Sequence, residues 1–428
     1  MTKKSRTILF LICVFLFLLI CPLTVLYSQG YRISFDYQQG GIKISKTGGF
    51  FVKAYPKQVD VLIEEVGSSK KTIKEKTDFF FGSLLVENLF PKKYKVEIKK
   101  EGYLPWQKVL EVKEKEVTGI KNIILFPENK EFTVFAQDLK NFWFFPDHKK
   151  IIFQEEGENS WSLKSYDLNN NVKSHLIDNV DISTKKSELI GLEISPDSRE
   201  INLEVAVSKN ITYFKIDLEK NPPALIKIKS PIAATGTDLV SEKFNNDTYS
   251  LDNLGNLFKN KEKLNDNPFT VKQEAKYVLK VSPDFIFLLE DKTLYKFNHD
   301  LKLFEKLSDD INDLKISPGS KTLAYLTDYE VWLFFLKDKE SEPTKKAGEK
   351  IILLRLSEKI KDFYWLNEDY LILNIGNAIR IIEIDNRNNV QSWGLADLSD
   401  PKMFFNDFDK KLYVLSENKL YCSNVLLP

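Results

Sequence analysis

Cysteine, histidine and net charge are scarce in this sequence. Its 428 residues include three cysteines and three histidines, and 62 basic side chains almost balance 61 acidic ones. Cys13 and Cys21 lie in an apolar N-terminal run, so the rest of the chain holds only Cys422 and cannot form an intramolecular disulfide. The balanced charge provides no net field to attract nucleic acid. Stability must therefore come from buried cores, and we expect no nucleic-acid partner.

Sequence motifs for common enzymatic chemistry are also missing. The chain has no Gly-x-Ser-x-Gly elbow, His-Glu-x-x-His or Cys-x-x-Cys pair, phosphate loop or dinucleotide fingerprint, and its histidines, His148, His175 and His299, lie far apart. The segment Asp167–Asn171 loosely resembles a calcium loop, but Val172 replaces the required glycine, so we interpret it as a hairpin turn. The sequence predicts no catalytic, cofactor-binding or metal-ligating residue and no cofactor.

The N-terminus contains one long apolar run. Ile8 to Leu26 carries no charge, and at 1.5 Å rise per residue its nineteen residues reach about 30 Å, the thickness of a hydrocarbon layer. The basic residues Lys3, Lys4 and Arg6 precede the run. The positive-inside tendency therefore predicts a cytoplasmic segment 1–7, a transmembrane signal anchor 8–27 and an extracytoplasmic remainder.

Two other interpretations of this run stay open. A cleaved secretory signal would need a shorter apolar core and a small-x-small cleavage site, which is not clear before Gln29-Gly30. A lipoprotein signal would use Cys21, but Ile20 stands where a small residue is expected and Pro22 follows. We favour an uncleaved, single-pass anchor in the cell membrane.

Residues 28–128 have the pattern of a small antiparallel β-domain. In the run Tyr94–Lys100, the side chains of Tyr94, Val96 and Ile98 alternate with charged ones, which is typical of a half-buried strand. Glu101-Gly102 ends that run, and strand character resumes near Val109. We expect the aromatic residues that follow the break to pack in the core of this domain.

The second half of this region resembles the PEGA domain, a small β-fold of bacterial surface proteins. The resemblance lies in Leu89–Ile98 and in Glu101-Gly102-Tyr103-Leu104-Pro105-Trp106, and it covers about residues 50 to 127. The name-giving motif is degenerate, because Tyr55-Pro56-Lys57-Gln58 stands where Pro-Glu-Gly-Ala would be. The resemblance implies an extracytoplasmic interaction or spacer module without known chemistry.

Residues 129–428 contain a recurring pattern of a strand, a Pro-Asp or Pro-Gly turn and a second strand. Four clear copies occur, at 145–153, 194–203, 281–284 and 316–325, and three weaker ones at 243–247, 365–373 and 405–414. A second marker, Tyr166-Asp167-Leu168 and Ile216-Asp217-Leu218, follows the first two turns at equal spacing. A period of roughly 40–50 residues is typical of four-stranded propeller blades.

These elements resemble the WD-repeat-like blades of tricorn-type and Tol-translocation-type bacterial propellers. The fold class that we predict is mainly β: an N-terminal helix, a PEGA-like domain and a β-propeller of about seven blades, with six or eight as alternatives. Ring closure protects strand edges without disulfides. The segment 220–275 is the most divergent blade, since it is rich in Asn and Lys.

The function predicted from these features is that of a membrane-anchored extracytoplasmic scaffold. Its propeller would present a surface to a protein or a cell-envelope polysaccharide, and this hypothesis comes from fold analogy. The alternative is a lyase, cyclase or hydrolase whose active site is built in the propeller channel from residues of several blades. The sequence identifies neither the partner, nor the binding face, nor the oligomeric state.

Overall fold

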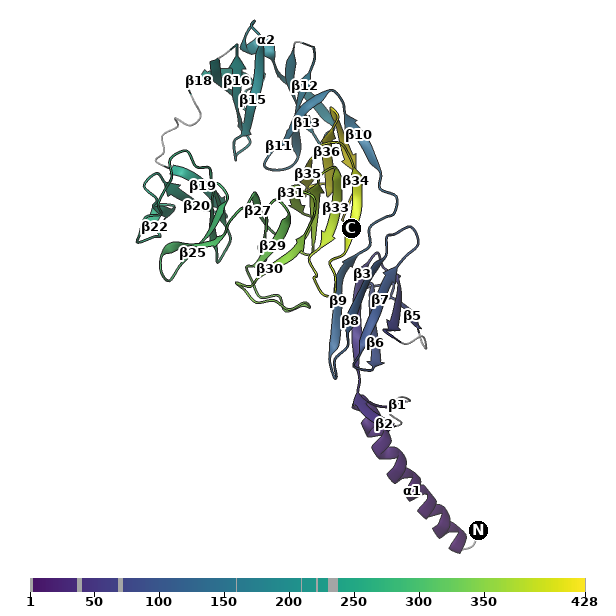
Figure 1. Cartoon of the computed structure of the whole chain (residues 1–428). Coiled ribbons are helices and arrows are strands. Elements are labelled where there is room, and N and C mark those ends of the chain that lie inside the picture. Colours follow the sequence, from purple (N-terminus) through teal and green to yellow (C-terminus); the bar gives the residue numbers. More distant parts are fainter. Residues whose placement is uncertain are drawn as a thin grey trace. The chain divides into compact units, whose positions relative to one another are not determined.

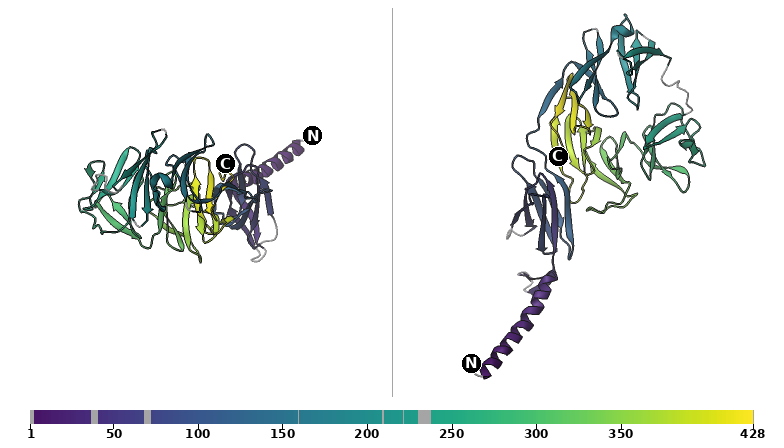
Figure 2. Two further views of the ribbon diagram at one scale, coloured as in Figure 1. Left: turned by 90° about the horizontal axis from the view of Figure 1, so that it is seen from above. Right: turned by 180° about the vertical axis from the view of Figure 1, so that it is seen from behind.

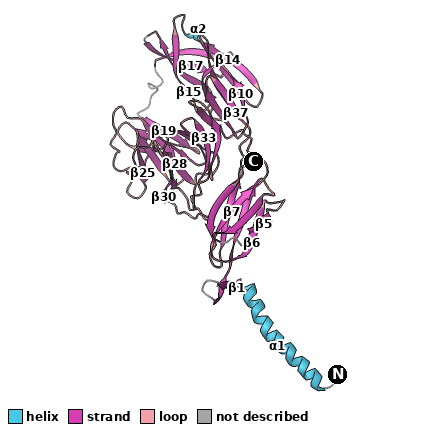
Figure 3. Ribbon diagram, turned by 45° about the vertical axis from the view of Figure 1, so that its right-hand side comes forward, coloured by secondary structure: helices cyan, strands magenta, loops and turns pink. Residues whose placement is uncertain are grey.

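The computed structural model of this chain describes residues 3–36, 41–67, 72–158, 160–208, 210–220, 222–229 and 238–427. Met1 and Thr2 of the predicted cytoplasmic segment lie outside these ranges. Strands account for 55% of the residues and helices for 7%. Figure 3 shows that the described helical residues lie in α1 (Lys3–Ser28) and the single turn α2 (Asn179–Ile182). The predicted mainly-β fold class is confirmed.

Helix α1 contains the apolar run recognised in the sequence. Its segment Ile8–Ser28 is 21 residues long, and none of its most apolar window is buried against the rest of the chain. By length and composition this helix can cross a membrane, although an N-terminal signal sequence would meet the same criteria. A β-hairpin of β1 (Tyr31–Asp36) and β2 (Gly41–Lys46) follows it.

The chain divides into two compact units. Unit 1 consists of residues 1–129 and two distant segments, 338–346 and 383–393. Unit 2 consists of 130–337, 347–382 and 394–428. The two distant segments connect strands of unit 2 in sequence, yet they pack with unit 1. The first unit is therefore completed by residues that lie more than two hundred positions away.

Unit 1 contains a β-sandwich (Figure 1). One sheet has the order β6-β3-β9 and the other β5-β4-β7-β8. Their bounds are β3 (Gly48–Tyr55), β4 (Asp60–Glu65), β5 (Thr72–Lys76), β6 (Ser83–Leu89), β7 (Lys93–Lys99), β8 (Trp106–Glu111) and β9 (Val117–Ile124). Strands β3 and β9 are parallel, and the other neighbours are antiparallel.

The core of the sandwich follows the alternation read from the sequence. In β7 the side chains of Tyr94, Val96 and Ile98 are buried, which confirms the half-buried strand. Phe50 of β3 meets the Tyr94 ring edge-on with 6.0 Å between centroids, so the two sheets share one core. Trp106 is fully buried, which confirms its predicted role in packing.

Unit 2 forms seven four-stranded antiparallel sheets within the described ranges. Six of them use consecutive strands, β11 to β14, β15 to β18, β19 to β22, β23 to β26, β27 to β30 and β31 to β34. Bounds for the first three sheets are β11 (Leu139–Phe144), β12 (Lys150–Glu156), β13 (Trp161–Asp167), β14 (Val172–Asp178), β15 (Ser187–Ile194), β16 (Glu200–Val207), β17 (Asn210–Asp217), β18 (Ala224–Ile228), β19 (Asp238–Phe244), β20 (Asp247–Asp252), β21 (Leu257–Lys259) and β22 (Glu262–Lys263). Bounds for the next three are β23 (Tyr277–Val281), β24 (Ile286–Glu290), β25 (Thr293–Asn298), β26 (Leu303–Ser308), β27 (Asp313–Ile316), β28 (Thr322–Leu326), β29 (Glu330–Phe335), β30 (Lys350–Arg355), β31 (Ile360–Trp365), β32 (Tyr370–Ile375), β33 (Ala378–Glu383) and β34 (Ser392–Asp397).

The seventh sheet joins both ends of unit 2. Strand β10 (Phe132–Ala136) pairs with β37 (Lys419–Ser423), next to β36 (Lys411–Ser416) and β35 (Lys402–Asn406). Figures 1 and 2 show the sheets following one another around a common centre. Seven such sheets, with the last completed by the first strand, are the topology of a seven-bladed β-propeller.

The repeated turns of the sequence occupy equivalent places in these sheets. Each of the seven predicted copies connects the first strand of a sheet to the second, and the turn after Tyr166 connects the third to the fourth. Adjacent sheets share apolar cores, such as that formed by Ile152, Leu163, Ile201 and Leu203 between the first two. The divergent blade has the short strands β21 and β22, which agrees with its few apolar residues.

Candidate functional site

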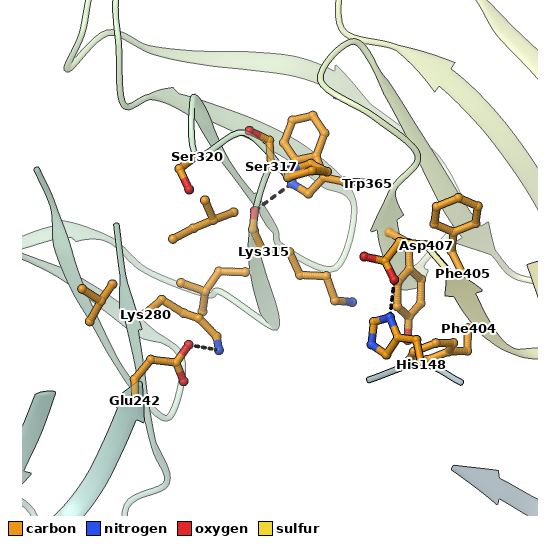
Figure 4. A pocket seen from close by; sticks show the side chains of 15 residues that line it. His148, Glu242, Lys280, Lys315, Ser317, Ser320, Trp365, Phe404, Phe405 and Asp407 are labelled. Carbon is orange, nitrogen blue, oxygen red and sulfur yellow. Dashed lines mark hydrogen bonds and ion pairs between the residues drawn. The ribbon is translucent and has the colours of Figure 1, made fainter. Parts of the chain in front are cut away.

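The centre of unit 2 contains a pocket of about 510 Å³ (Figure 4). Its lining comes from the first strands of five sheets, β19, β23, β27, β31 and β35, from turns that follow some of them, and from His148 in the turn after β11 of a sixth sheet. A pocket shared by the first strands of several blades lies on the propeller axis. Because the repeated turns also contribute, the pocket opens at the end of the ring where those turns lie.

Lys315 is the most highly coordinated charge in this region. Its ammonium group lies 2.7 Å from a carboxylate oxygen of Asp313 and 2.7 Å from one of Asp362. It also lies 4.2 Å from the centroid of the Tyr364 ring. Burial raises the pKa of Asp362, although Lys315 acts in the opposite direction. Burial likewise raises the pKa of Tyr364 well above its usual range.

An ion pair and a histidine–carboxylate contact frame the pocket. Glu242 of β19 and Lys280 of β23 belong to neighbouring sheets and are 2.8 Å apart. The Nδ1 atom of His148 contacts Asp407, and each of the two side chains comes from the turn after the first strand of its sheet. Figure 4 shows these pairs on opposite sides of Lys315. Each lysine described in the lining thus has a carboxylate beside it.

Aromatic rings form the remaining wall. Phe404 stacks on Phe144 with a centroid distance of 4.2 Å and an interplanar angle of 12°. His148 meets Phe404 edge-on at 5.3 Å, and Tyr364 meets it at 5.5 Å. The indole N–H of Trp365 donates to the Lys315 carbonyl at 2.9 Å and is therefore already engaged. Apolar ring faces beside paired charges suit a polar ligand that also offers apolar surface.

None of these residues was predicted from the sequence as a site residue, although His148 was noted as one of three separated histidines. The repeats contain a signal that marks them. Lys280, Lys315, Tyr364 and Phe404 occupy the same register, each directly before a copy of the repeated turn pattern (281–284, 316–325, 365–373 and 405–414). Repeated strands around an axis bring equal register positions together, so the alignment of blades locates this pocket even without a local motif.

Two other groups of polar residues lie close together, one in the turn at Asp167 and one near α2. The backbone N–H groups of Asn169 and Asn170 donate to the Asp167 carboxylate at 2.9 and 3.1 Å, which confirms a hairpin turn. One group of possible metal ligands, His175, Asp178 and Asp181, lies on the surface near α2. The Asp178 N–H donates to Asp181 at 2.8 Å, so the first turn of α2 accounts for this geometry.

Unit 1 contains a second set of ion pairs, whose central pair is sealed from solvent. The Lys108 side chain has no exposed surface, and its ammonium group lies 2.6 Å from Glu383, whose side chain is 3% exposed. The indole N–H of Trp106 donates to the other Glu383 oxygen at 2.9 Å. Burial raises the pKa of Glu383, against the influence of Lys108.

The same set of charges continues into the two distant segments of unit 1. Arg387 binds Asp385 at 2.7 Å and Glu342 at 2.5 Å, which ties both distant segments of unit 1 together. Burial acts to raise the pKa of Asp385, but the hydrogen bonds and charges of Arg387 and Lys108 hold it below its usual range. We call Lys108, Glu383, Asp385, Arg387 and Glu342 the sealed cluster.

Comparison with known proteins supports no family assignment. No protein-family model matches the sequence, and no curated protein matches it either. Solved structures resemble its fold, among them the Swd1 β-propeller domain of Myceliophteria thermophila (11% identity, 69% of this chain and 100% of that one, TM-score 0.39). Two others are YCF48 from Cyanidioschyzon merolae (10%, 69% and 98%, 0.41) and virginiamycin B lyase from Staphylococcus aureus (10%, 69% and 100%, 0.41). At such values these likenesses carry no argument about function, and the propeller assignment rests on sheet topology.

Proposed function

We propose that this protein is a membrane-anchored extracytoplasmic scaffold that binds a partner at the axial pocket of its propeller. The observation that carries the proposal is the pocket itself, in which six blades place paired polar groups and aromatic rings around about 510 Å³. Helix α1 would keep the chain in the cell membrane, with residues 1–7 in the cytoplasm and the rest outside. The sandwich of unit 1 would act as a PEGA-like spacer.

The pairing of the pocket charges favours binding as its role. Lys280, Lys315 and His148 each contact a carboxylate, so these groups are held in fixed positions and offer their remaining hydrogen-bonding capacity to a ligand. A segment of a protein or of a cell-envelope polysaccharide combines polar groups with apolar surface and fits this lining. Because the local charges nearly balance, we expect a ligand without a strong net charge.

The proposal is tested by affinity capture from detergent-solubilised native membranes. The full-length protein is compared with the double variant Lys280→Ala/Asp407→Ala, which removes one member of each pair that frames the pocket. Both pairs are partly exposed, so the fold should lose at most about 1 kcal/mol per pair. The matched control is Lys306→Ala/Asp309→Ala, which removes a pair 2.7 Å apart at the end of β26, the last strand of its sheet.

We expect a protein or polysaccharide that the wild type and the control enrich and the pocket variant does not. Equal enrichment by all three would place the binding surface elsewhere and contradict the pocket. A polysaccharide that is shortened by the wild type but not by the pocket variant would instead support the channel-enzyme alternative.

A further inference from the structure

The region where α1 meets the sandwich gathers aromatic and basic side chains. The described part of α1 ends at Ser28, and Gly30 follows two residues later. The Gly30 carbonyl accepts hydrogen bonds from the Thr47 N–H at 2.8 Å and from the Thr47 hydroxyl at 2.9 Å. Both ends of the β1–β2 hairpin are therefore fixed next to the end of the helix.

The length of this connection sets its depth in a membrane. Two extended residues span at most about 7 Å, and each headgroup layer of a bilayer is roughly 5–8 Å thick. If Ile8–Ser28 crosses the hydrocarbon layer, Gly30 and Thr47 must lie within or directly above the headgroups. Side chains next to these two residues then face lipid phosphates.

Three basic residues stand at this level. The Arg32 guanidinium lies 3.4 Å from the centroid of the Tyr27 ring and donates to the Tyr27 carbonyl at 2.8 Å, at the helix C-terminus. Lys46 lies 4.6 Å from the centroid of the Tyr31 ring. The Lys115 N–H donates to the Thr47 carbonyl at 3.0 Å, which fixes that residue beside Lys46.

Lys46 and Lys115 lie next to each other, which is unfavourable for two basic side chains unless an anion is bound nearby. The neighbouring Lys46 lowers the pKa of Lys115, mainly through a side-chain hydrogen bond and then through its charge. The same contact raises the pKa of Lys46, and Glu114 acts to raise the pKa of both lysines to a smaller extent. Like charges held together by backbone hydrogen bonds gain most from an anion bound between them.

We propose that Arg32, Lys46 and Lys115, with the rings of Tyr27 and Tyr31, form a collar that binds the phosphates of anionic lipids at the outer surface of the membrane. Aromatic rings at headgroup level and basic residues next to a span are the side chains that this layer favours. The collar would hold the base of the sandwich at the bilayer surface. This inference rests on the proposed anchored topology.

The test uses the full-length protein in nanodiscs that contain phosphatidylcholine and phosphatidylglycerol in equal parts. Spin-labelled forms of both lipids report how strongly the protein restricts each of them. We expect the wild type to restrict phosphatidylglycerol more strongly, and the variant Lys46→Gln/Lys115→Gln to lose about fivefold of this preference per lysine, since each basic residue near an anionic surface contributes ~1 kcal/mol. Added salt should weaken the preference in the wild type.

The control Lys53→Gln/Lys99→Gln removes two exposed lysines at the opposite end of the sandwich and should behave like the wild type. Because any basic residue near the other leaflet is the same in all variants, the collar is measured by the difference between variants. An equal preference for phosphatidylglycerol in the wild type and the Lys46/Lys115 variant would overturn the collar. Competition by inorganic phosphate at constant ionic strength would show that the site binds a free anion instead. Extraction of the protein by carbonate would contradict the anchor itself, whereas an integral protein without lipid preference would contradict only the collar.

Discussion

The sealed cluster of unit 1 and the axial pocket of unit 2 use the same kinds of ion pair in opposite environments. Lys108 has no exposed side-chain surface, whereas 28% of the Lys315 side chain is exposed, yet both lysines bind two carboxylates. In the sealed cluster the central pair of Lys108 and Glu383 is desolvated and satisfied by the protein alone, and exposure rises outward to Glu342, whose side chain is 36% exposed. In the pocket the same groups are satisfied and still reachable.

This difference separates a structural role from a binding role. Burying an ion pair costs desolvation energy, which is offset only when each charge meets its partner in good geometry. Such a pair therefore specifies which chain segments pack together. Here it specifies that 338–346 and 383–393 complete unit 1. An open set of pairs positions polar groups for a ligand at a smaller cost in stability. Four substitutions test this comparison, in order of decreasing effect.

Lys108→Met should give the largest loss. It leaves Glu383 buried without its cation, and breaking a buried pair costs about 3–5 kcal/mol. Amide hydrogen exchange in β8 should accelerate accordingly, because β8 carries both Lys108 and Trp106. The exposed Lys99→Met is the matched control and should change little. Unchanged protection of β8 in the Lys108 variant would contradict a structural role for the sealed cluster.

Lys315→Met should cost less, about 1–2 kcal/mol, since Asp362 and Lys315 are each partly exposed. The substitution should raise the pKa of Asp362 further, because the opposing cation is gone. Chemical denaturation, monitored with a probe in unit 2, measures the loss of stability. The amount of partner captured should fall by a larger factor than this loss explains. A loss of stability as large as that of Lys108→Met would mean that Lys315, like Lys108, has a structural role and would contradict the comparison.

Lys402→Met should be neutral or slightly stabilising at pH 7, because the residue is exposed and only part of its side chain is desolvated. The Lys402 ammonium donates to the amide oxygen of Asn141, and burial lowers its pKa. A lysine with a lowered folded-state pKa destabilises the protein below that pKa. Stability of the wild type should therefore rise as the pH increases from this value toward 10.5, and this rise should be absent in the variant. Thermal melts over that range check the sign.

Asp78→Asn should have the smallest effect, because this carboxylate is partly exposed on a turn of unit 1. Hydrogen bonds from the Ser83 hydroxyl and the Phe81 N–H lower the pKa of Asp78 to about 2. A lowered folded-state pKa gives stability that is present above the ordinary value of 3.8 and is lost as the pH falls toward 2. The difference in Tm between wild type and variant should shrink over that window, and a constant difference would contradict the ionic origin.

Most of the fold was accessible from the sequence because it depends on local periodicity. The alternation around Val96 marked a strand, and each repeated turn near residues such as Pro196 and Pro318 lies between the first two strands of a sheet. The count of seven blades followed from those turns. The pairing of β10 with β37 is non-local, and no pattern in either strand indicates it.

The site could not be predicted in the same way. Lys280 and Lys315 resemble any lysine in a polar strand, and only the closure of the ring brings Tyr364 and Phe404 to the same pocket. Lys108 and Glu383, which form an ion pair, are 275 positions apart and lie in regions with different sequence patterns. Such contacts depend on how blades and segments assemble, which single-sequence periodicity does not contain. The equal register of the pocket residues is the one signal that an alignment of blades would have used.

The most direct test of the account is photo-crosslinking in native membranes. Benzoylphenylalanine replaces Phe404 in the pocket wall of the full-length protein or, as a control, Leu301, which is 58% exposed before β26. The account predicts that the partner found by affinity capture crosslinks from position 404 and not from position 301. Crosslinking from 301 alone, or capture of the partner without any crosslink from 404, would contradict the axial pocket as the binding site.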